Sequence, residues 1–234
     1  MVRVDTVYQR VLAIANKEQR GYITPQEFNL FANQAQMDIF EQYFYDLNQF
    51  SRVRGNNTEY SDMVTIIEEK INIFETQQSI ASTYDNINGT FSLIIPGLYR
   101  MGTIQIGGVE VEKYEHKEFK IINRSPLLKP TASRPVYYVK GNLAYIHPNE
   151  DLDDTSDINA HYIRKPNRAV WGYVVTQEKA LYNANASTDF ELHASEETDL
   201  VIKILQLAGI TIEDPSLYQI ASQEDVKNTQ QEKQ

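Results

Sequence analysis

The chain has 234 residues, of which 41% are apolar and 15 are tyrosines, so it can build a substantial hydrophobic core within one large domain. Its formal net charge of −10 disfavours general binding of duplex DNA and adhesion to an anionic membrane, because both need clustered Lys and Arg. It contains no cysteine, which excludes disulfides, thiolate nucleophiles and cysteine-ligated metal centres. The first ten residues lack the apolar segment of a signal peptide, and no apolar run is long enough to span a membrane.

The first third of the chain has the periodicity of helices. Apolar residues predict a short amphipathic helix over residues 5–20, which ends at Gly21. A second helix is predicted to start at Pro25, because Thr24 is a good N-cap and Glu27 lies where it completes a capping box. Its broad apolar face continues to Leu47.

A third helix is predicted over residues 62–75, with Ser61 as its N-cap. Four apolar residues at helical spacing are expected to face the core: Val64, Ile67, Ile71 and Phe74.

The middle of the chain has the signals of β-hairpins. Asn88 and Gly89 form a hairpin turn before the apolar run 91–95, and Gly107 and Gly108 connect alternating segments over 99–106 and 109–114. A third hairpin is predicted from 136–139 and 143–146, with a further strand over 158–163. Between these strands, we expect a short helix over 115–123 and a proline-rich loop over 125–135.

The end of the chain returns to helix. Ser195 is expected to cap a helix over 196–208, and Gly209 is expected to end it. Its predicted apolar face comprises Leu200, Ile204 and Leu207. Asp214 and Pro215 have the pattern of another helix start, and the polar residues 222–234 are expected to form a flexible tail.

These elements predict an α+β fold with an N-terminal helical bundle, a β-rich meander and C-terminal helices followed by an extended tail. We expect a single domain over residues 1–221, which is helical over 1–76, β-rich over 77–194 and helical again over 195–221.

The sequence contains few patterns that indicate catalysis. It has no Gly-x-Ser-x-Gly elbow, no Walker loop and no His-Glu-x-x-His, so we expect no catalytic residue, no bound metal and no cofactor. Two metal sites remain as hypotheses. His147 and His161 would meet if their strands paired, and the acidic segment 150–157 resembles a calcium loop but lacks its Gly and Glu, so a solvated loop is the simpler interpretation. Distant carboxylates of a glycosidase would leave no local motif.

Two aromatic features suggest contacts with partners. Arg164, Lys165, Arg168 and Trp171 have the composition of a basic and aromatic nucleic-acid patch, although the rest of the chain is acidic. The tyrosines are suited to protein interfaces, because each offers a large contact area with a polar tip.

The order of these segments resembles the virion structural proteins of short-tailed bacteriophages, in particular a ring protein of crAss-like phages. The resemblance follows the helical segment 16–28, the strand segments 134–138 and 143–148, the segment 162–166 with Trp171 and Gly172, and the closing blocks 189–192, 202–210 and 218–221. It implies a virion protein of the head–tail junction, made in the host bacterial cytoplasm, without enzymatic activity.

The same resemblance implies about twelve copies in a ring beneath the portal. The expected partners are other copies of the chain, the portal protein and other tail or ring proteins, while DNA passes through the channel without specific binding and no membrane is involved. A capsid-decorating or cargo protein, and a tail-associated glycan hydrolase, are the alternatives.

The C-terminal segment is the expected interface. Leu217, Tyr218 and Ile220 lie within one helical turn of each other, in a segment too poor in apolar residues to fold alone. We therefore expect these three residues to dock on the portal or on a neighbouring copy. The alternative is that Leu217 and Ile220 complete the core of their own chain.

Overall fold

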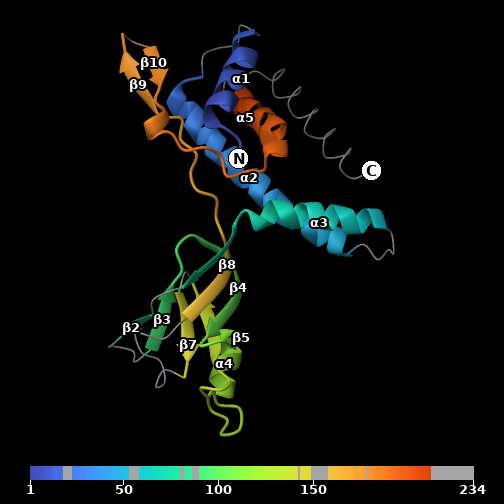
Figure 1. Ribbon diagram of the computed structural model, residues 1–234, viewed down its shortest axis with the longest axis vertical. Helices are drawn as coiled ribbons and strands as arrows, with labels where there is room; N and C mark the ends of the chain where they lie inside the picture. Colours follow the sequence, from blue (N-terminus) through green and yellow to red (C-terminus); the bar gives the residue numbers. More distant parts are fainter. Residues whose placement is uncertain are drawn as a thin grey trace. The chain divides into compact units, whose positions relative to one another are not determined.

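The computed structural model describes residues 1–17, 23–52, 58–79, 82–85, 90–141, 143–148, 158–177 and 179–211. The described chain forms two compact units, one built from residues 1–73 with the segment that starts at Pro166, and the other from Phe74–Lys165. Helices dominate the first unit and strands the second (Figure 1). The α+β class is therefore confirmed, with helices at both ends and a β-rich middle, whereas the expected single domain of residues 1–221 comprises two units.

The helical unit is built on one long central helix. Its helices are α1 (Val4–Lys17), α2 (Pro25–Arg52), α3 (Thr58–Asn72) and α5 (Glu197–Thr211), the last preceded by a 3₁₀ turn, η2 (Ala194–Glu196). The predicted capping box starts α2, because the Thr24 N–H donates to the Glu27 carboxylate at 2.9 Å and the Glu27 N–H donates to the Thr24 hydroxyl at 3.3 Å. Helix α2 packs against both α3 and α5.

Buried polar groups connect α2 to the segment that leads to α5. Gln36 is 1% exposed, donates to the Asn167 carbonyl at 2.7 Å and accepts from the Glu191 N–H at 3.2 Å. The buried Glu191 carboxylate accepts from the backbone and side-chain N–H groups of Asn167. Every one of these contacts joins residues far apart in sequence, so the network fixes how the two ends of the chain pack together.

Four predicted helix boundaries are wrong. Helix α3 begins at Thr58, so Ser61 lies inside it and is not its cap, and the helix ends before Phe74, which is buried in the β-rich unit. Ser195 lies within the 3₁₀ turn, whose N-cap is His193. Helix α5 continues through Gly209, because packing of Leu200, Ile204 and Ala208 offsets the helix cost of one glycine, about 1 kcal/mol.

The strands of the β-rich unit form one mixed sheet in the order β1-β8-β4-β5-β6-β7-β3-β2. Their bounds are β1 (Glu75–Ser79), β2 (Ser82–Asp85), β3 (Thr90–Ile94), β4 (Leu98–Ile106), β5 (Val109–Lys113), β6 (Val136–Lys140), β7 (Leu143–His147) and β8 (Ile158–Arg164). The predicted hairpins β4–β5 and β6–β7 are present, and β5 and β6 run parallel because α4 (His116–Ile122) connects them. Strand β1 was not predicted.

This sheet must curl on itself. Its two edge strands, β1 and β2, are connected by residues 80 and 81 alone, so Ser79 and Ser82 lie at most about 11 Å apart along the chain. A flat sheet of eight strands would separate its edges by roughly 34 Å. The enclosed side holds the core, which comprises Leu93, Ile95, Ile104, Val111, Tyr137, Ala144, Ile146, Ile158, Ala160 and Tyr162.

Candidate interaction surfaces

The predicted interface residues Leu217, Tyr218 and Ile220 lie outside the described residues, as do the acidic segment 150–157 and the tail 222–234. The described part of the chain offers three other features that bear on function. They are a polar hollow on the curled sheet, a half-buried histidine beside α4, and a two-stranded arm on the helical unit.

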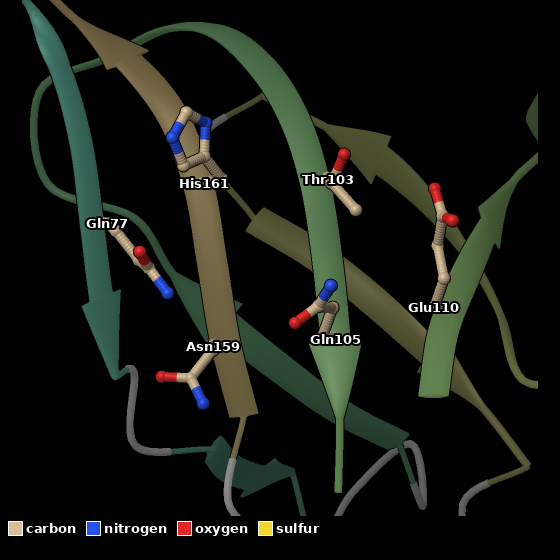
Figure 2. Close-up of a pocket in the computed structure, with 6 residues that line it drawn as sticks. All are labelled: Gln77, Thr103, Gln105, Glu110, Asn159 and His161. Atoms are coloured by element: carbon tan, nitrogen blue, oxygen red, sulfur yellow. The ribbon is translucent and has the colours of Figure 1, made fainter. Parts of the chain in front are cut away.

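The hollow lies on the outer face of the sheet, across β1, β8, β4 and β5 (Figure 2). Its volume is about 380 Å³, and its lining is polar: Gln77, Thr103, Gln105, Glu110, Asn159 and His161. Register explains the cluster, because Gln105 lies opposite both Glu110 and Asn159, and Gln77 lies opposite His161.

Gly102 brings β4 and β8 close together beside this hollow. A Cβ atom at Gly102 would lie 2.6 Å from the His161 carbonyl oxygen, and the β4–β8 register shifts between Met101 and Ile104. The result is an open surface of hydrogen-bonding groups with one carboxylate and one imidazole. Among the described residues, no three His, Cys, Asp or Glu side chains gather as a metal site.

The hypothesis that His147 and His161 share a metal is wrong, because β7 and β8 are not neighbours in the sheet. His147 instead stacks on Phe119 of α4, with ring centroids 4.3 Å apart, and on Tyr138. Its Nε2 atom is buried and makes no hydrogen bond within the described structure. Burial lowers the pKa of this imidazole, so the neutral form is favoured.

The third feature is an arm made by β9 (Tyr173–Thr176) and β10 (Lys179–Tyr182) (Figure 1). Among the described strands, these two pair only with each other and form a separate two-stranded sheet. Val174 and Leu181 lie opposite each other on one face, and Val175 lies on the other. All three are more than half exposed, with Val175 at 64%. The rest of the described chain therefore covers neither face of the arm, and an isolated hairpin is only marginally stable in water.

Trp171 anchors the base of this arm to the helices. The ring centroids of Trp171 and Tyr8 lie 4.2 Å apart, and the Trp171 indole N–H donates to the Asp5 carboxylate at 3.0 Å. The Asn29 side chain accepts from the Trp171 N–H at 2.7 Å and donates to the Trp171 carbonyl. Trp171 also contacts the rings of Tyr173 and Tyr182. The arm thus has a fixed base and bare outer faces.

The predicted nucleic-acid patch does not form around Trp171. The ring is 2% exposed and is committed to Asp5 and Tyr8, so it offers no stacking platform for a base. Arg164 and Lys165 belong to the β-rich unit, whereas Arg168 and Trp171 belong to the helical unit.

No helix in the described residues is both long and apolar enough to cross a membrane. Comparisons of the sequence with protein families and with curated proteins found no match.

Proposed function

We propose that this protein is a virion structural protein, and that its copies join into a head–tail connector ring around the DNA channel beneath the portal of a short-tailed bacteriophage. The observation that carries this proposal is the arm β9–β10, whose apolar residues Val174, Val175 and Leu181 are exposed on both faces. An anchored hairpin with bare apolar faces gains stability when another chain covers it. The sequence resemblance supplies the identity of the assembly, and the arm supplies a surface for assembling it.

The composition of the chain supports the same function. Copies of one chain close into a ring through heterologous contacts, in which two different surfaces meet. A net charge of −10 disfavours retention of DNA that slides through such a ring.

The location of the protein in phage particles tests the proposal. Antibody labelling of particles from the phage that encodes this chain should mark one vertex per particle, where head and tail meet. Labelling over the whole capsid would support the capsid-decorating alternative, and the absence of the protein from particles would refute a structural role.

An arm variant tests the observation on which the proposal rests. Val174→Thr with Leu181→Gln removes the apolar surface of one face while retaining side chains that β-strands tolerate. We expect a folded protein that fails to enter particles. Val109→Thr, which removes an exposed apolar side chain outside the arm, is the matched control and should still enter. Normal incorporation of the double variant would exclude the arm as an assembly surface.

A further inference from the structure

A basic and apolar patch lies at one end of the β-rich unit. It is formed by the exposed face of α4 and by the turn that follows, and consists of Lys117, Lys120, Ile121, Arg124, Leu127, Leu128 and Lys129. Its three aliphatic side chains are strongly exposed, at 71% for Ile121, 90% for Leu127 and 45% for Leu128. Single exposed aliphatic residues are ordinary, but three within eight residues mark a contact surface.

The patch has a fixed backbone. The Arg124 N–H donates to the Ile121 carbonyl and the Ser125 N–H to the Ile122 carbonyl, at 3.2 and 3.0 Å. The Lys129 N–H closes a further turn on the Ser125 carbonyl at 3.0 Å. Leu127 and Leu128 are therefore displayed by a hydrogen-bonded turn, and docking them costs little backbone entropy.

The local charge of this patch is opposite to that of the chain as a whole. Residues 113–134 contain six Lys or Arg and two Glu, within a protein of net charge −10. The salt bridge from Arg134 to Glu112, at 3.2 Å, lies beside the patch. Four exposed cations of α4 and its turn therefore outnumber the two exposed carboxylates Glu115 and Glu118 at the start of α4. A surface of this kind fits a partner that is both acidic and apolar.

The helical unit of the same chain presents such a surface along α2. Leu30, Gln34, Asp38, Glu41 and Tyr45 recur at spacings of three or four residues, so they share one face of the helix. All five are exposed, with Leu30 at 67% and Tyr45 at 54%. Lys203 of α5 interacts with Asp38, and Glu41 adds a second negative charge to this stripe.

We propose that the basic patch of one copy docks on the α2 stripe of a second copy. Lys120 and its neighbouring cations face Asp38 and Glu41, while the patch leucines pack against Leu30 and Tyr45. This inference rests on the proposed ring, for which it names a contact. The two surfaces differ, so the contact is heterologous and repeats from copy to copy, as ring closure requires.

A pair of charge-reversed variants tests this contact. Lys117→Glu with Lys120→Glu makes the patch negative, and Asp38→Lys with Glu41→Lys makes the stripe positive. All four residues are exposed, so both variants should fold, with far-UV circular dichroism as the check. The parent chain should self-associate in sedimentation velocity as its concentration rises. Each variant alone should lose about tenfold or more in apparent association constant, because like charges then meet.

Mixing the two variants is the decisive step. Each negative patch then meets a positive stripe, and each positive patch meets a negative stripe, so association should return to near the parent level. Lys140→Glu, exposed at the end of β6 and outside the patch, is the matched control and should associate like the parent. Salt should weaken association of the parent, because the Debye length falls from about 10 Å at 0.1 M to about 3 Å at 1 M.

Several results would overturn the proposed contact. They are an absence of self-association by the parent, undiminished association of either variant, or a failure of the mixture to restore it. Leu127→Ser gives an independent check, since it removes the most exposed side chain without changing charge and should weaken association as well.

Cosedimentation of the parent with vesicles containing anionic lipid, lost in the patch variant, would assign the patch to a membrane and refute docking on a second copy. Refutation of the contact between patch and stripe would not refute the proposed ring, because antibody labelling of particles tests the ring without regard to which surfaces meet.

Discussion

Replacing Gln36 by leucine should destabilise the helical unit strongly. Gln36 is buried, and its amide makes two hydrogen bonds, to the Asn167 carbonyl at 2.7 Å and from the Glu191 N–H at 3.2 Å. Leucine fills much of the same volume but leaves both backbone groups buried without a partner. Each such group costs about 1–3 kcal/mol, and burial of the apolar side chain recovers roughly 1–2 kcal/mol. We expect a net loss of about 2–4 kcal/mol in the free energy of unfolding.

The single tryptophan allows this loss of stability to be measured in the helical unit. Trp171 lies in the helical unit, so its fluorescence reports unfolding there even where the two units unfold separately. For a chain of this size, the loss corresponds to a decrease of roughly 5–15 °C in Tm. Gln42→Leu on the same helix is the control, because among the described residues the Gln42 amide donates to the Asp46 side chain, one turn away.

We expect the control to change stability by less than about 0.5 kcal/mol. If Gln36→Leu were no more destabilised than Gln42→Leu, the buried network would not hold the two ends of the chain together in the way its geometry indicates.

Two further predictions concern the β-rich unit. Burial lowers the pKa of His147, so the neutral imidazole contributes stability that is fully present above the unfolded pKa of about 6.5 and is lost as the pH falls below it. His147→Phe should therefore flatten the decline in the free energy of unfolding between about pH 7 and pH 5, measured by denaturant titration at each pH. A variant whose stability declines with falling pH as steeply as that of the parent would refute this, and so would an equal flattening by His161→Gln. Gly102→Ala should lower the free energy of unfolding by about 1–3 kcal/mol, because its Cβ would lie 2.6 Å from the His161 carbonyl oxygen. Thr103→Ala, the control, should lower it by less than about 1 kcal/mol. Equal losses for the two variants in chemical denaturation would show that β4 and β8 can separate without penalty.

Local sequence signals predicted the elements whose ends they define. Thr24 and Glu27 form the expected capping box, and Glu115 with Glu118 forms another at the start of α4. Gly107 and Gly108, with φ values of 55° and 83°, make the expected turn between β4 and β5. In each case, the residues that specify the structure lie within a few positions of one another.

Elements without a reliable local signal were missed or misplaced. Strand β1 has the sequence ETQQS, which contains no apolar residue, and it is a strand because all five residues pair with β8. The arm β9–β10 turns at Gln177, a residue with a φ of 51° where Gly or Asn would have signalled a hairpin. The helix over 58–72 was predicted to start late because Ser61 has the appearance of a cap.

The candidate surfaces were hidden in the sequence for a different reason. Leu127, Leu128 and Val174 are apolar residues in short segments, and the pattern alone does not distinguish such residues from core positions. Only the fold shows that they are exposed, whereas Trp171, which the composition suggested as a surface platform, is buried against Asp5 and Tyr8.

The β-rich unit is inserted into the sequence of the helical unit, and this arrangement explains how one chain can present two separate interaction surfaces. The chain enters the β-rich unit at Phe74 and leaves it after Lys165, and the Arg164 N–H donates to the Phe74 carbonyl at 3.0 Å. Entry and exit are therefore adjacent, so the insertion leaves the helical unit able to complete its own core from both ends of the chain. Each unit can then present a surface that its own folding does not need. A heterologous contact requires two such surfaces on one chain, and the patch on α4 and the stripe on α2 meet that requirement on separate units.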